Sequence, residues 1–67
     1  MPLTWWRGKV LRKIREKRGM TQTALAERVG VHRVTIAYLE SGARQPSMDL
    51  LQRLAKVLKV KVADLLE

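Results

Sequence analysis

The segment TQTALAERVGVHRVTIAYLESG, residues 21–42, decides the fold because it contains two short amphipathic patterns separated by a glycine. The apolar residues of each pattern fall on one side of a helix: Leu25, Ala26 and Val29 in the first, Ile36 and Leu39 in the second. Gly30 follows the first pattern directly, where the chain must leave helical geometry and a residue that accepts positive φ costs least. Thr21 is expected to cap the first of these helices. The segment therefore predicts two helices that share a core at a steep angle, a helix-turn-helix.

Three further helices are predicted around this pair. Within residues 7–18 one narrow arc is formed by Val10, Leu11 and Ile14. Gly19 ends this first helix, and Ser47 is expected to cap the fourth. The apolar half of the fourth helix consists of Leu50, Leu51, Leu54, Ala55, Val57 and Leu58. A last turn or two of helix is expected over residues 62–66.

Two adjacent tryptophans precede the first helix and match no motif. If Thr4 caps an extension of that helix, Trp6 lies near its apolar side and is expected in the core. Trp5 then lies on the far side. An outward-facing Trp5 is expected to cover a partner or the second subunit of a dimer.

Length and composition limit the classes of protein to which this chain can belong. With 67 residues it is expected to form one domain over residues 1–67. The chain has no Cys, which excludes disulfides and Cys-based zinc sites and is compatible with a reducing cytoplasm. No apolar run approaches the roughly 20 residues that span a bilayer, and the start of the chain is too short for a signal sequence. A soluble cytoplasmic protein without membrane contact is expected.

The chain is strongly basic, with 14 Lys and Arg residues against 6 Asp and Glu and a net charge of +8. Such an excess is typical of proteins that bind a polyanion, above all nucleic acid. Charge alone leaves two alternatives open: a charge that only keeps a small protein soluble, and a cationic helix on a membrane surface. The membrane alternative needs apolar stripes that face lipid, whereas each stripe here has a partner stripe on another helix.

Taken together, these residues resemble the Cro/C1 (Xre-type) helix-turn-helix family, the fold of the lambda-type phage repressors. The resemblance covers nearly the whole chain and rests on an ordered set: Gln22, Leu25-Ala26, Gly30, Ile36, Leu39, Glu40-Ser41-Gly42, Pro46-Ser47 and Asp64-Leu65-Leu66. It implies an all-α, lambda-repressor-like domain of five helices, with the helix-turn-helix at helices 2 and 3 and the third helix in the major groove. The chain departs from many members at His32, where they have Ser or Thr, and at Ala43, where they have Lys.

The face of the third helix opposite Ile36 and Leu39 is free to enter a groove of DNA. The candidate base-contacting residues on it are Arg33, Val34, Ala37 and Tyr38. An arginine can donate two hydrogen bonds to guanine, a valine can pack on a thymine methyl, and a tyrosine can reach a base edge. The alternative is an ordinary solvated face.

Phosphate contacts are expected at the ends of the same two helices. Gln22 lies in the first turn of the second helix, where free N–H groups favour a phosphate oxygen, and the resemblance implies the same role. The other candidate phosphate contacts are Thr21, His32, Ser41 and Arg44. Glu40 would repel phosphate, and the resemblance implies instead that it pairs with Arg15 of the first helix and fixes the recognition helix.

The sequence thus predicts a transcription regulator, most consistent with a repressor associated with the nucleoid that binds a pseudo-palindromic operator in double-stranded DNA as a homodimer. The dimer is expected because each chain has one short recognition helix and because the last turn carries more apolar residues than its own docking needs, namely Val62, Leu65 and Leu66. The alternatives are an antitoxin with a toxin partner and an adaptor that acts by protein contact. No enzyme, metal or cofactor is expected, because the chain lacks a nucleophile–base grouping, a phosphate loop and paired carboxylates.

Overall fold

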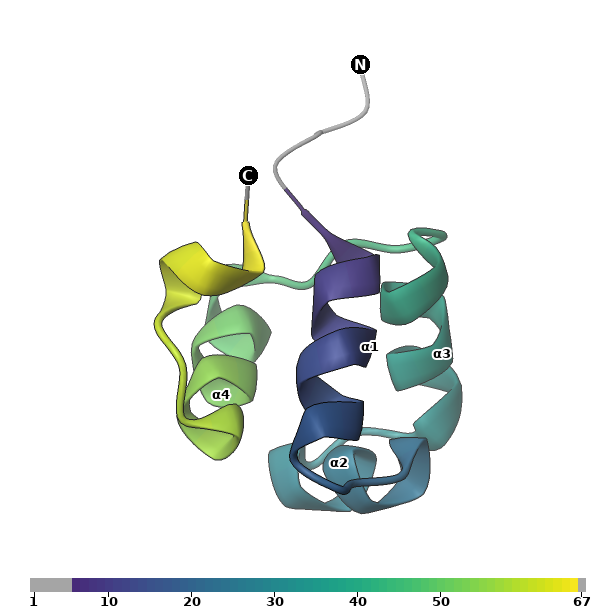
Figure 1. Cartoon of the computed structure of the whole chain (residues 1–67). Helices are drawn as coiled ribbons and strands as arrows, with labels where there is room; N and C mark the ends of the chain where they lie inside the picture. The colour runs from purple at the N-terminus through teal and green to yellow at the C-terminus, as the bar shows by residue number, and fades with distance from the viewer. Residues whose placement is uncertain (1–5, 67) are drawn as a thin grey trace.

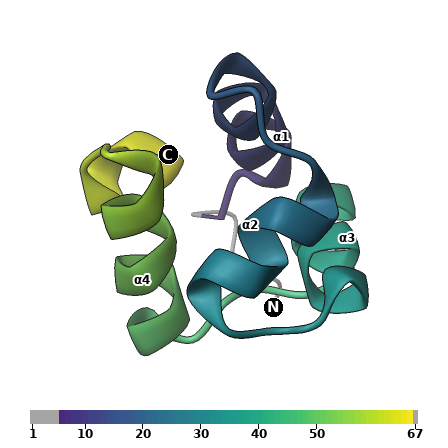
Figure 2. The ribbon, with the colours of Figure 1, turned by 90° about the horizontal axis from the view of Figure 1, so that it is seen from below.

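The computed structural model describes residues 6–66 and contains four α-helices and a short 3₁₀ helix (Figure 1). These elements are α1 (Gly8–Lys17), α2 (Gln22–Val29), α3 (Arg33–Ser41), α4 (Met48–Leu58) and the 3₁₀ helix η1 (Val62–Leu65). Helix α2 contacts both α3 and α4, and α1 packs on α3. Seen from below, α2 crosses between α3 and α4, which lie on opposite sides of the domain (Figure 2).

The core consists of one apolar stripe from each element. Its buried members are Trp6, Leu11, Leu25, Ala26, Val29, Ile36, Leu39, Leu50, Leu51, Leu54, Ala55, Leu58 and Leu65. Every residue of the predicted stripes in the helix-turn-helix is among them. In the fourth helix Val57 is only half-buried, and the rest of its predicted apolar half is buried.

The predicted ends of α2 and α4 are present in the structure. Thr21 Oγ1 accepts a hydrogen bond from Ala24 N at 3.0 Å, and Ser47 Oγ accepts one from Leu50 N at 3.2 Å. Gly30 ends α2 with φ +79°, the left-handed conformation that glycine adopts at least cost. The short-range signals of residue type and spacing are therefore sufficient to place the helix-turn-helix.

The expectation of five helices is wrong in one respect, because the last element is a 3₁₀ helix of four residues rather than an α-helix. Lys61 N donates to Asp64 Oδ2 at 2.9 Å, which closes a single turn. Leu66 then has extended geometry, φ −118° and ψ 162°, and forms an antiparallel bridge with Trp6. The chain leaves helical geometry there because it pairs with the segment that precedes α1.

Trp6 and Arg7 precede α1 and contact distant parts of the chain. The Trp6 indole donates its N–H to the carbonyl of Leu39 at 2.8 Å, and Arg7 N donates to the carbonyl of Leu65 at 3.3 Å. An α1 extended back through Trp6 is therefore wrong, although Trp6 is buried as expected. The predicted cap at Thr4 and the predicted outward position of Trp5 concern residues outside those that the structure describes.

The expectation that the last turn has more apolar residues than its own docking needs is wrong for Leu65. Its side chain is fully buried within its own domain, and Val62 and Leu66 pack half-buried against the same core. The last turn thus uses these residues to close its own domain. Their apolar character carries no argument for a second subunit.

Two arginines join the helices through backbone carbonyls. Arg18 Nε donates to the carbonyl of Leu58 at the end of α4, at 2.9 Å. Arg53 donates to the carbonyl of Val29 at the end of α2, at 2.7 Å, and pairs with Asp49 at 3.1 Å. Each guanidinium satisfies a carbonyl that a helix end leaves without an intrahelical partner. Arg18 is thus a structural contact between the end of α1 and the end of α4.

No helix among residues 6–66 is long and apolar enough to cross a membrane.

Candidate nucleic-acid interface

Helix α3 forms one edge of the domain, so that one of its long sides is turned away from the other helices (Figures 1 and 2). Ile36 and Leu39 are buried on the inner side. Three of the predicted base-contacting residues are exposed on α3, and the fourth, Ala37, is half-buried. The exposed three are Arg33, Val34 and Tyr38, of which Val34 is 46% exposed and Tyr38 43%. The structure therefore places this predicted group together on one accessible helix.

Arg44 lies next to this surface, in the loop that follows α3. Its guanidinium stands over the Tyr38 ring, 5.3 Å from the centroid, and its backbone N donates to the carbonyl of Tyr38 at 3.2 Å. The ring face attracts a cation, so this contact holds the Arg44 charge against the side of α3. A strong positive charge is thus fixed at the C-terminal end of the candidate interface.

The other predicted phosphate contacts differ in the hydrogen-bonding capacity that the structure leaves them. The Thr21 hydroxyl accepts from Ala24 N, which leaves its proton free to donate. The Ser41 hydroxyl donates to the carbonyl of Tyr38 at 3.1 Å, so that its one proton is already in use. His32 is exposed at the position before α3 and forms no side-chain cap there.

The Arg15–Glu40 pair implied by the resemblance is present and buried. Arg15 Nε lies 2.6 Å from Glu40 Oε2, and Arg15 donates from its Nη2 to Glu40 Oε1 at 3.1 Å. Only 9% of the Arg15 side chain and 5% of the Glu40 side chain are exposed. A further bond from Arg15 Nη1 to the carbonyl of Met20, at 2.8 Å, also ties the pair to the turn before α2. The hydrogen bonds to Glu40 raise the pKa of Arg15, and the nearby carboxylate charges add to this effect against the cost of burial.

Gln22 connects this pair to the surface of α3. Its Nε2 donates to Glu40 Oε1 at 3.0 Å, and its Oε1 accepts from Arg33 Nη1 at 3.4 Å. Gln22 was predicted only as a phosphate contact. One of its two amide protons remains for that role, since the bond to Glu40 uses the other.

Sequence reasoning missed Gly8, which allows the start of α1 to approach α3. An ideal Cβ at this position would lie 2.3 Å from the carbonyl oxygen of Leu39 and 2.6 Å from that of Glu40. Both atoms belong to the backbone, so any side chain at residue 8 must push the two helices apart. A glycine in the first turn of a helix, with no capping role, was the available signal for this close contact.

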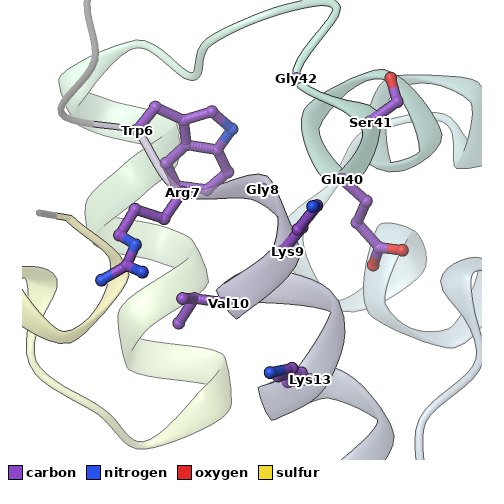
Figure 3. Close-up of a pocket in the computed structure, with 9 residues that line it drawn as sticks. All are labelled: Trp6, Arg7, Gly8, Lys9, Val10, Lys13, Glu40, Ser41 and Gly42. Atoms are coloured by element: carbon purple, nitrogen blue, oxygen red, sulfur yellow. The ribbon is translucent and has the colours of Figure 1, made fainter.

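A recess of about 350 Å³ opens where α1 meets the end of α3 (Figure 3). Its lining consists of Trp6, Arg7, Gly8, Lys9, Val10, Lys13, Glu40, Ser41 and Gly42. In Figure 3 Gly8 lies at the start of α1, with Trp6 on its left and Glu40, which comes from α3, on its right. The recess is a contact between α1 and the end of α3, with the cationic side chains of Arg7, Lys9 and Lys13 around it. The lining residues include no nucleophile paired with a base, and among residues 6–66 no group of three His, Cys, Asp or Glu residues could hold a metal ion.

A helix-turn-helix family model matches residues 11–65 of this chain. Among curated relatives, an uncharacterised HTH-type transcriptional regulator of Archaeoglobus fulgidus is 46% identical over 55 residues, which cover 82% of this chain and 79% of the relative. The control protein C.BamHI of Bacillus amyloliquefaciens is 38% identical over 61 residues, which cover 90% of this chain and 75% of that protein.

Among solved structures, the P22 c2 repressor bound to a synthetic operator is similar to this chain over almost its full length. The TM-score is 0.88 at 33% sequence identity, and the match covers 96% of this chain and 97% of the repressor. Residues 21–42 of this chain thus belong to a fold that a related protein uses on operator DNA.

Proposed function

We propose that this chain, which belongs to the Cro/C1-type helix-turn-helix family, is a transcriptional repressor that binds a pseudo-palindromic operator as a homodimer. As a member of that family the chain is a DNA-binding transcriptional regulator and not an enzyme. What we propose beyond family membership is base reading through the major groove, a homodimeric assembly and repression of transcription. We also propose that residues 1–67 act as one functional domain.

The observation that carries the proposal is the outer face of α3. Arg33, Val34 and Tyr38 are exposed on a helix whose inner side is buried in the core, and Arg44 adds a positive charge beside Tyr38. Arg33 and Val34 lie in the first turn of α3, the part of a recognition helix that reaches base edges in the major groove. Val34 and Tyr38 lie outside the buried core, and both fit a groove wall.

The roles within the interface follow from side-chain chemistry. Arg33, Val34, Ala37 and Tyr38 contact base edges, and Arg33 donates two hydrogen bonds to a guanine. Contacts to the phosphate backbone come from Thr21, Gln22, His32 and Arg44. Ser41 joins them by turning its hydroxyl proton from the Tyr38 carbonyl to a phosphate oxygen. The buried Arg15–Glu40 pair holds α1 and α3 together and touches no DNA.

The homodimer follows from the length of the recognition helix. Helix α3 has nine residues, and one such helix reaches only a few base pairs of a major groove. Two copies related by a twofold axis meet successive grooves about 34–36 Å apart on one side of the duplex. A twofold complex requires a site with the same symmetry.

The test is selection of bound sites from random double-stranded DNA, followed by sedimentation of the complex on the selected site. We expect inverted half-sites whose centres are about 10 base pairs apart, and two chains per site. Selected sites without dyad symmetry, bound by a single chain, would contradict the proposal. Repression is tested separately, by placing the selected site over a reporter promoter and measuring transcription with and without the protein.

A further inference from the structure

Four side chains form a continuous hydrogen-bonded series from the core to the surface of α3. Arg15 donates to both carboxylate oxygens of Glu40, and Glu40 Oε1 also accepts from Gln22 Nε2 at 3.0 Å. Gln22 Oε1 then accepts from the Arg33 guanidinium at 3.4 Å. We call these four residues the relay. Its inner end is the buried Arg15–Glu40 pair, in which the Glu40 side chain is 5% exposed. Its outer end is Arg33, an exposed residue in the first turn of α3.

The charge of Glu40 decides which way the Gln22 amide faces. A carboxylate only accepts hydrogen bonds, so the amide must turn its NH₂ group toward Glu40. The amide oxygen then points to the other side, where Arg33 is located and where it can accept from a guanidinium, which only donates. The opposite orientation would bring oxygen against the carboxylate and NH₂ against the guanidinium, and both contacts would become repulsive.

On the basis of the function proposed above, we propose that Glu40 is a positioning residue for base recognition, which orients Arg33 through the amide of Gln22. Arginine has a long side chain whose rotamer freedom must be lost when it contacts a base. The Gln22 oxygen restricts Arg33 before DNA binds, and so favours its contact with a base edge over the many phosphate oxygens nearby. Base preference thus depends on a buried carboxylate that does not touch DNA.

The experiment compares Glu40→Gln and Gln22→Met with the wild-type chain. Glu40→Gln keeps the size of the side chain but lets the Gln22 amide reverse, and Gln22→Met keeps the length but removes both hydrogen bonds. Arg33→Ala identifies the base pair that Arg33 reads. The readout is the ratio of Kd between the selected site and the same site altered at that base pair, since a uniform loss of affinity cancels from this ratio.

We expect both relay variants to lower this ratio by about five- to tenfold, part of the discrimination that a good bidentate contact gives. The double variant should lose no more than either single one, because both act through the same link. Trp6→Phe is the matched control: it removes a buried hydrogen bond to the end of α3 and leaves the relay intact, so it should lower stability and keep the ratio. In the free protein, the side-chain amide signals of Gln22 in a ¹⁵N NMR spectrum should shift toward those of a solvated amide in Glu40→Gln.

The following results would overturn the positioning role of Glu40, and each has a distinct pattern. Retention of the wild-type ratio in both relay variants, with loss in Arg33→Ala, overturns it and leaves the proposed function standing. An equal loss in Trp6→Phe overturns it also, because general loosening of α3 would then be the cause. If Glu40→Gln does not fold, Gln22→Met at the half-buried position decides alone. A wild-type chain with no base preference overturns the proposed function together with the relay.

Discussion

Glu40 Oε2 lies 2.6 Å from Arg15 Nε, in a buried contact between the first and third helices. The second carboxylate oxygen accepts from Arg15 Nη2 at 3.1 Å, so the guanidinium and carboxylate meet edge to edge. Such bidentate pairs are among the stronger charged hydrogen bonds, but two desolvated charges oppose that gain. The pair is therefore most important for keeping the helices in one relative position. Removal of one partner should cost more stability than replacement of both.

Glu40→Ala should lower the free energy of unfolding by about 3 kcal/mol, because it leaves the Arg15 guanidinium buried without its partner. This is a large part of the roughly 3–5 kcal/mol that a core of this size supplies. The double variant Arg15→Met/Glu40→Leu should recover part of the loss, since no charge remains buried alone. Urea unfolding measures both.

The matched control is Glu16→Ala, which removes the exposed partner of Arg12 on the same helix. Arg12 and Glu16 are 3.4 Å apart, with 64% and 53% of their side chains exposed, so this loss should stay below about 0.5 kcal/mol. Additive effects of the Arg15 and Glu40 substitutions, with no coupling, would show that the pair does not act as a unit.

Gly8→Ala tests the close approach of the first helix to the third. The added methyl group would overlap backbone oxygens of Leu39 and Glu40, and neither can rotate away. We expect a loss of about 1–3 kcal/mol from overpacking, even though alanine is the better helix former. Thermal unfolding followed by circular dichroism measures it.

Lys9→Ala, one residue further along, serves as the control because Lys9 is exposed. Its effect should remain within about 0.5 kcal/mol of the wild type. A Gly8→Ala variant as stable as Lys9→Ala would mean that the two helices have room to separate, and that the contact does not restrict residue 8.

Local signals predicted most of the fold. Thr21 and Ser47 are good caps by residue type alone, Gly30 is required by the turn, and the leucines of α4 share one face by spacing alone. These signals depend on residues within one or two turns of each other. They are therefore visible in the sequence without knowledge of the tertiary structure.

What could not be predicted depends on contacts between distant parts of the chain. No periodic pattern in the sequence indicates the bridge from Trp6 to Leu66 or the bond from Arg18 to the carbonyl of Leu58. Leu65 looks surplus to the docking of the last turn because nothing local indicates that this turn meets the residues before α1 and is buried. Five of the predicted DNA-contacting residues lie on α3, as the spacing predicts, but the hydrogen bond between Gln22 and Glu40 is apparent only in three dimensions.

Arg44→Ala tests the phosphate role of the loop after the third helix. The variant should bind all sequences more weakly by a similar factor, because phosphates carry no sequence information. The slope of log K against log salt should become shallower by about 1 per lost contact, hence about 2 for a symmetric dimer. Titrations at several salt concentrations measure this slope.

Gln22→Ala is the uncharged control for this experiment. It should also weaken binding without a change of salt slope, because glutamine releases no counterion. A salt slope in Arg44→Ala equal to that of the wild type would place the Arg44 guanidinium away from the phosphates, with its contact to Tyr38 as its main role.

The central claim is that the first turn of the third helix reads base edges. The most direct measurement is the affinity of Arg33→Ala for a panel of single-base variants of the selected site, at one salt concentration and beside the wild-type chain. The account predicts a loss of about 1–3 kcal/mol on the selected site and a relaxed preference at one position in each half-site, with non-specific binding only slightly weaker. An unchanged base preference with a uniform loss of affinity would contradict it, because Arg33 would then contact phosphate and α3 would lie differently in the groove.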